Sequence, residues 1–152
     1  MSREKPRRRG IYLDHSATTP VRPEVLEAML PFLREYHGNA GSLHRFGRNC
    51  RRAVETAREQ VAALINAEPR EILFTSGGTE SDNLAIRGIV EARDGTTKRM
   101  VTTAVEHHAV LHTGESLART NRVDLQIVGV DRGGLVDPDA VEALLGDETV
   151  LV

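Results

Sequence analysis

Apolar residues recur at helical spacing in two stretches of the first half of the chain. Residues 23–36 and about 48–66 place apolar side chains three or four positions apart, with charged residues on the other face. Pro31 predicts a kink in the first of these helices. Cys50 lies on the apolar stripe of the second, which favours a small buried side chain over a reactive thiol. We therefore expect two amphipathic helices joined by the glycine-rich loop "HGNAGSLHRFG".

The pattern becomes more regular after Glu71, where short apolar runs alternate with segments of helical periodicity. The apolar runs span residues 72–75, 100–105 and 125–130. The helical segments begin near Thr79, His108 and Asp137. This alternation predicts an α/β fold with βαβαβα units, in which parallel strands are joined by right-handed crossovers.

The end of the chain predicts one more strand. The last helix has Asp137 as its N-cap, Pro138 in its first turn and Gly146 at its end, and "DETVLV" follows it. A parallel sheet that stopped there would have an incomplete edge. We therefore expect the N-terminal portion of a larger protein. Its expected parts are a disordered basic tail (1–10), an N-terminal segment with small-domain and active-site loop elements (11–66), and the truncated first part of a large domain (67–152).

Composition narrows the class of protein. The chain has 152 residues, a hydrophobic content of 39% and a net charge of -2, and no apolar run approaches the ~20 residues of a membrane helix. We therefore expect a soluble protein that binds neither membranes nor nucleic acid. A single cysteine excludes an internal disulfide framework and fits a reducing compartment, so we expect a cytoplasmic location.

Candidate ligand-binding residues follow two of the predicted strands. Residues 76–79, "SGGT", come after the first strand, and Glu106 and His107 come after the second. Ligands of open parallel sheets bind beyond the carboxyl ends of the strands. Adjacent strands would bring these two groups together, and His107 would then contact a flat, conjugated ligand.

The "SGGTE" turn has two interpretations. Two glycines would let the backbone approach an anion at the N-terminus of a helix, and the Thr79 hydroxyl would add a donor. Alternatively, Thr79 caps an ordinary helix with Asp82 as a weak capping-box partner. The turn matches neither the P-loop nor the dinucleotide fingerprint. The residues alone leave both interpretations open.

Two other polar groups carry weaker signals. His108 and His112 would share a helical face, but a third ligand is missing, and no metal site is expected. The polar stretch "DHSATTP", residues 14–20, is compatible with turn chemistry or with a substrate loop.

Five motifs occur together in a familiar order: "YLDHSATTPVRPEVLEAMLPFL", "GNAGSLHRFG", "EILFTSGGTESDNLAIRG", "TTAVEHHAVL" and "VDRGGLVDPDAVEALL". With this order and spacing, the sequence resembles the cysteine desulfurases over residues 11–152. These are pyridoxal 5'-phosphate (PLP) enzymes of the class V aminotransferase family. The resemblance implies an incomplete PLP fold type I large domain.

The resemblance also implies roles for individual residues. Gly78 and Thr79 correspond to the turn that binds the cofactor phosphate, and His107 to the histidine that stacks on the pyridine ring. The substrate-loop candidates are Ala17, Thr18, Thr19 and Asn39. The loop that carries Asn39 departs from the family pattern, because Ala40 stands where "GNP" has its proline.

The activity implied is conversion of L-cysteine to L-alanine, with sulfur passed to an enzyme persulfide that supplies iron-sulfur clusters or thio-cofactors. A sulfur-acceptor or scaffold protein and a homodimeric state are implied as well. The lysines of the chain are Lys5 and Lys98, and Lys98 precedes the second predicted strand, away from the site. No catalytic residue is therefore assigned in this chain, which we expect to be inactive alone. Another class V enzyme, such as a selenocysteine lyase, and a non-catalytic truncated remnant remain as alternatives.

Overall fold

The computed structural model describes residues 10–95 and 97–152, and the chain divides into two compact units between Ile72 and Leu73. Residues 1–9 of the predicted basic tail lie outside the described residues. Each unit is described by itself below.

The first unit is helical. Helix α1 spans Pro23–Arg34, helix α2 spans Arg45–Leu64, and a short 3-10 helix, η1, spans Pro69–Glu71. Helix α1 has Pro23 in its first turn, where a missing N–H costs nothing, and it continues through Pro31. Helix α2 begins earlier than predicted because the His44 ring accepts a hydrogen bond from the Gly47 N–H and caps it.

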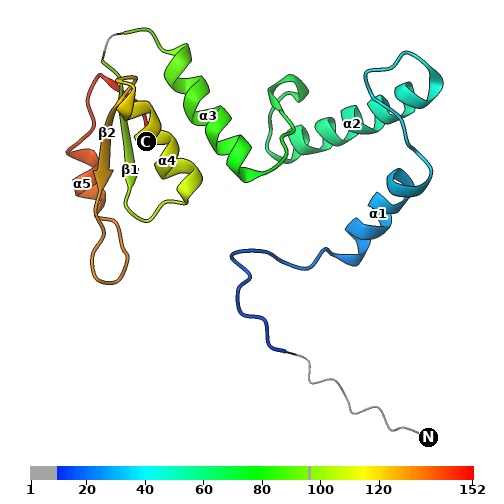
Figure 1. Cartoon of the computed structure of the whole chain (residues 1–152), viewed down its shortest axis with the longest axis horizontal. Helices are drawn as coiled ribbons and strands as arrows, with labels where there is room; N and C mark the ends of the chain where they lie inside the picture. Colours follow the sequence, from blue (N-terminus) through cyan, green and yellow to red (C-terminus); the bar gives the residue numbers. More distant parts are fainter. Residues whose placement is uncertain (1–9, 96) are drawn as a thin grey trace, which may run out of the picture. The chain divides into compact units, whose positions relative to one another are not determined.

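The second unit is a three-stranded parallel sheet with helices (Figure 1). Its elements are α3 (Gly78–Ala92), β1 (Arg99–Thr103), α4 (His108–Arg119), β2 (Asp124–Val128), α5 (Pro138–Glu142) and β3 (Thr149–Leu151). The strand order is β2-β1-β3, and β1 pairs in parallel with both neighbours. The α/β fold and the strand in "DETVLV" are thereby confirmed.

Helices α3 and α4 pack side by side and share one apolar core with the sheet. The buried members of this core are Ile86, Val90, Met100, Leu117 and Val123. Gly114 allows α4 to approach the sheet closely, since a Cβ atom there would lie 3.0 Å from Leu125 Cδ1 and 3.3 Å from Met100 Sδ. The core therefore fixes how the N-termini of the two helices lie relative to each other.

The amino end of the sheet is held by Arg99. Its guanidinium donates to Asp124 at 3.0 Å, forms an ion pair with Glu148 at 2.6 Å and donates to the Leu144 carbonyl at 3.2 Å. The hydrogen bond from Arg99 holds the pKa of the Asp124 carboxyl below its ordinary value, and Gln126 adds to this effect. One side chain thus ties β1 to β2 and to the segment before β3.

The predicted strand at residues 72–75 is wrong. The backbone of Ile72 is extended, but residues 72–75 pair with no strand in the described part of the chain. Leu73 and Phe74 are 68% and 47% exposed. An apolar extended segment becomes a strand only when a neighbour satisfies its backbone groups, and the sheet seen here is β2-β1-β3 without it.

The end of the last predicted helix is also wrong. Helix α5 has Asp137 as its N-cap and Pro138 in its first turn, as predicted, but it ends at Glu142, before Gly146. The N–H groups of Leu144 and Leu145 donate to carbonyls three residues earlier, which tightens the chain into turns.

A candidate anion and ring site between helices α3 and α4

The N-terminus of α3 is open in front of its two glycines. Gly77 is the N-cap with an extended backbone (φ 160°, ψ -179°), and no side chain caps the helix. A Cβ atom at Gly77 or Gly78 would meet nothing within 4 Å. Neither backbone conformation nor internal packing therefore requires these glycines, and the space above the free N–H groups is available to a ligand.

Thr79 is not the helix cap. It lies inside the first turn of α3, and its hydroxyl makes no hydrogen bond within the described chain. The capping alternative for the "SGGTE" turn is thereby wrong. A free hydroxyl beside free N–H groups is the donor set that a phosphate prefers.

Glu80 braces the residue that precedes the glycines. Its carboxylate accepts hydrogen bonds of 2.6 Å from the Ser76 hydroxyl and of 2.6 Å from the Ser76 N–H. These two bonds, the hydroxyl's first, hold the pKa of the exposed Glu80 carboxyl below its ordinary value. The turn is thus held at Ser76 by side-chain bonds, while its glycines stay open.

His107 is the N-cap of α4, a role that its sequence motif did not indicate. Its Nδ1 accepts a hydrogen bond of 3.1 Å from the Ala109 N–H. This bond assigns the proton of a neutral ring to Nε2 and restrains the orientation of the imidazole. The ring is otherwise exposed, so its face is accessible to a flat ligand.

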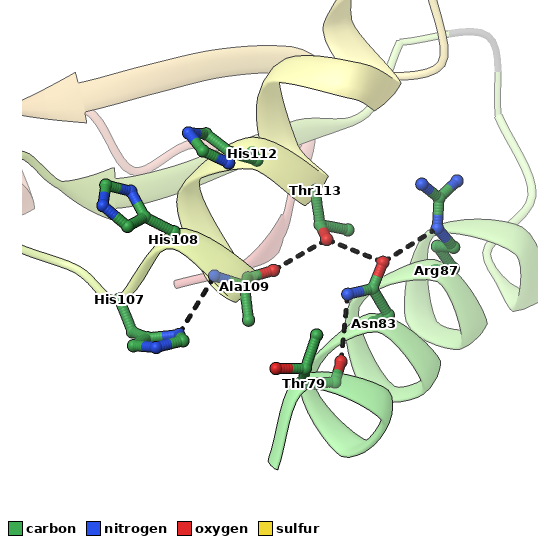
Figure 2. A pocket seen from close by; sticks show the side chains of 8 residues that line it. All are labelled: Thr79, Asn83, Arg87, His107, His108, Ala109, His112 and Thr113. Carbon is green, nitrogen blue, oxygen red and sulfur yellow. Dashed lines mark hydrogen bonds between the residues drawn. The ribbon is translucent and has the colours of Figure 1, made fainter. Parts of the chain in front are cut away.

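A groove of about 340 Å³ joins the two helix N-termini (Figure 2). This volume falls within the range of roughly 300–1,000 Å³ typical of small-molecule sites. The groove is lined by Thr79, Asn83, Arg87, His107, His108, Ala109, His112 and Thr113. The lining includes a cation and three imidazoles but no carboxylate, which favours an anionic ligand.

Thr79 and His107 are thus brought together, as predicted, but by helix packing. We expected adjacent strands to place the two residues near each other, whereas the packing of α3 against α4 places both at one groove. Gly78 lies at the start of α3, beside the groove lining. Within residues 10–95 and 97–152, no group of three or more His, Cys, Asp or Glu side chains has a metal-binding arrangement.

The substrate-loop candidates lie in the first unit, so their proximity to the groove stays a prediction. Ala17 and Thr18 lie at a turn in which both N–H groups donate to the Asp14 carbonyl, and Thr19 follows it. The Asn39 side chain accepts a 2.8 Å hydrogen bond from the Gly41 N–H, and Arg51 donates to the Ala40 carbonyl at 3.0 Å. These bonds order the loop although it lacks the proline of the family pattern.

Asn83 and Arg87 line the groove but were missed by the sequence analysis. Both follow Thr79 at intervals of four residues, so they lie on the same face of α3. That spacing is the signal that could have found them, once Thr79 was taken as a site residue. Which helix they would face depends on the packing of α4.

Comparison with known proteins decides the family. The model of the family described as "Aminotransferase class-V" matches residues 11–152. The chain belongs to the class V aminotransferase family. Among the relatives of this class V chain, "Cysteine desulfurase IscS" of Dictyoglomus turgidum is 48% identical over 145 residues, which cover 95% of the chain and 36% of the relative.

Two solved structures resemble the class V chain closely. A "NIFS-LIKE PROTEIN" superposes with a TM-score of 0.83 at 37% identity, covering 91% of the chain and 38% of the neighbour. "SspA in complex with cysteine" superposes with a TM-score of 0.78 at 33% identity, covering 91% and 40%. The chain therefore has the architecture of PLP fold type I cysteine desulfurases and spans little more than a third of the length of the relatives it matches.

The described residues include no helix that is both long and apolar enough to cross a membrane.

Proposed function

We propose that this chain supplies the phosphate-binding and ring-stacking half of the PLP site of a cysteine desulfurase. The whole enzyme would convert L-cysteine to L-alanine and pass the sulfur to an enzyme persulfide. The observation that carries the proposal is the convergence of Thr79 and His107 on one groove without carboxylates. The cysteine bound in one structural neighbour supports the substrate assignment.

The residues present fit the cofactor. The open N-terminus of α3 and the unbonded hydroxyl of Thr79 would hold its phosphate. The exposed His107 ring, restrained by its bond to Ala109, would lie against its pyridine ring. When bound, PLP supplies an electron sink for bonds at the α-carbon of an amino acid. The roles of this chain are to bind and orient the cofactor.

The covalent attachment of PLP is not assigned to this chain. Lys98 precedes β1 at the amino end of the sheet, and its ammonium donates to the Val90 carbonyl at 2.5 Å. Site residues lie at the other end of β1, where His107 follows it. We therefore propose that residues 1–152 alone bind PLP without a Schiff base and release no sulfide from L-cysteine. A homodimer and a sulfur-acceptor or scaffold protein belong to the proposed whole enzyme.

Ligand binding tests the phosphate assignment directly. Pyridoxamine 5'-phosphate and pyridoxamine carry no aldehyde, so neither forms a Schiff base, and their difference in affinity reports the phosphate contact. We expect residues 1–152 to prefer the phosphorylated ligand. Replacing Thr79 by Val removes one hydroxyl donor and should weaken that preference about tenfold. Equal binding of both ligands by the unmodified chain would contradict the proposed function.

A chimera tests the activity. Residues 11–152 replace the matching segment of the Dictyoglomus turgidum relative, and alanine and sulfide formation from L-cysteine are measured. We expect activity with L-cysteine that His107→Ala reduces. A folded chimera that loads PLP yet releases no alanine would contradict the cysteine desulfurase assignment. Borohydride reduction of residues 1–152 with PLP should trap no stoichiometric adduct on Lys98.

A further inference from the structure

Asn83 lines the groove and makes hydrogen bonds within α3 and to α4 (Figure 2). Its Nδ2 donates to the Thr79 carbonyl at 3.0 Å, one turn earlier on α3. Its Oδ1 lies 2.8 Å from the Thr113 hydroxyl of α4 and 3.4 Å from Arg87 Nε. The side chain therefore contacts the predicted phosphate turn and the neighbouring helix at the same time.

The orientation of this amide is determined by its partners. Nδ2 must face the Thr79 carbonyl, because a flipped amide would set two acceptors against each other there and two donors against each other at Arg87. Oδ1 consequently faces α4 as an acceptor. The buried Thr113 hydroxyl has one proton and two acceptors, Asn83 Oδ1 at 2.8 Å and the Ala109 carbonyl at 2.7 Å.

The path through this amide joins the two parts of the proposed site. Thr79 lies at one end of it, and the first turn of α4, which His107 caps, lies at the other. Thr113 reaches that first turn through the Ala109 carbonyl, and the Ala109 N–H is the group that orients the His107 ring. The single proton of the Thr113 hydroxyl is shared between Asn83 Oδ1 and the Ala109 carbonyl, and this shared bond links the phosphate turn to the first turn of α4.

We propose that Asn83 is a positioning residue that sets the Thr79 turn against α4 for phosphate binding. The proposal rests on the proposed function of the groove. The apolar core of Ile86, Val90 and Leu117 already holds α3 and α4 together, so general adhesion of the helices does not require an amide. The half-buried Asn83 amide, which donates to the Thr79 carbonyl, instead sets the orientation of the Thr79 turn relative to α4.

The test uses Asn83→Leu, which keeps the side-chain size, favours the helix and removes all amide bonds. The measurement is the affinity ratio of residues 1–152 for pyridoxamine 5'-phosphate over pyridoxamine, by fluorescence titration. We expect the ratio to fall about five- to tenfold, as for the loss of one or two hydrogen bonds. A variant that merely loosened the fold would weaken both ligands alike and leave the ratio unchanged.

Variants of the partner residue provide an independent arm. Thr113→Val removes the hydroxyl at nearly constant volume and should lower the affinity ratio by about two- to fivefold. Thr113→Ser keeps the hydroxyl and should give the ratio of the unmodified chain. Asn49→Leu, the same exchange on α2, is the matched control and should leave the ratio unchanged. If Asn83→Leu fails to fold by circular dichroism, the Thr113 pair carries the test.

Failure of this inference is distinguishable from failure of the proposed function. Suppose that the unmodified chain prefers the phosphorylated ligand and that the folded Asn83→Leu chain keeps the full preference. The positioning role is then wrong, and the proposed function stands. Where Asn83→Leu does not fold, the Thr113→Val chain decides in the same way. If the unmodified chain shows no preference, both are wrong. A fall in the ratio with Asn83→Leu or Thr113→Val that Thr113→Ser does not share supports the role.

Discussion

Helix α2 in the first unit and helix α3 in the second each have glycine at the N-terminus, and the glycines serve different purposes. At Gly47, in the first turn of α2, a Cβ atom would lie 2.6 Å from the Asn39 carbonyl oxygen and 2.8 Å from Ser42 Cβ. At Gly77, the N-cap of α3, and at Gly78, its first residue, a Cβ atom would meet nothing within 4 Å. The first glycine is required by the chain's own packing, whereas the second pair leaves space that the chain does not fill.

The space around the position of a missing Cβ distinguishes a glycine required by packing from one that leaves room for a ligand. Where backbone atoms of the same unit occupy the space that a Cβ would fill, packing alone accounts for the glycine and no ligand is needed to explain it. The Gly77–Gly78 pair needs no such packing and leaves space beside an unbonded hydroxyl, where the proposed ligand would bind. Substitutions to alanine should therefore affect folding at Gly47 and binding at Gly78.

Gly47→Ala should have the largest effect. Its Cβ would collide with backbone atoms of the Asn39 loop, so the loop or α2 must move. After the gain in helix propensity, we expect a net loss of about 2 kcal/mol in the free energy of unfolding, measured by urea titration. Gly88→Ala on α3, where a Cβ meets nothing within 4 Å, is the control and should be neutral or stabilising. Equal stability of the two variants would contradict the claim that packing requires a glycine at position 47.

Gly78→Ala should change ligand affinity rather than stability. The new methyl group would enter the open space at the N-terminus of α3, while alanine suits the helix better than glycine. We expect unchanged or higher stability and about tenfold weaker binding of pyridoxamine 5'-phosphate. Pyridoxamine, which lacks the phosphate, should bind as before. A loss of stability like that of Gly47→Ala would show that the second turn is also used for packing.

At the second turn, acid should have the smallest effect of the three changes. The lowered pKa of Glu80 means that its bonds to Ser76 stabilise the turn fully above the ordinary glutamate pKa and are lost as pH falls through the lowered value. We therefore expect faster amide exchange at Ser76 at low pH, after correction for intrinsic rates. The Gly41 amide, bonded to the neutral Asn39 side chain, is the internal control. Glu80→Gln should remove most of the pH dependence at Ser76.

Local signals in the sequence predicted the helices well and one strand badly. The starts predicted for α3, α4 and α5, near Thr79, His108 and Asp137, lie within one residue of the observed starts. Residues 72–75 have equally strong apolar character, yet they join no strand of the sheet in the described chain. Strand formation depends on a partner distant in sequence, which a local pattern does not contain.

The candidate site was predicted in part. Thr79 and His107 were expected to lie near each other, and both line one groove, although helix packing rather than strand adjacency places them there. The N-cap role of His107 and the bridge through Asn83 were not expected. Asn83 could have been placed on the face of Thr79 from its spacing, but its bond to Thr113, 30 residues later, arises only when α3 and α4 pack.

The sequence by itself determined the α/β class of the second unit, the amphipathic helices of the first, and a set of motifs that resemble one PLP family. These features are local or depend on residue order, so they survive without coordinates. Tertiary structure decided which turn is open, which hydroxyl is free and which side chains cross between helices. Packing decides these because they depend on the distance between atoms that the chain brings together only when its apolar core forms.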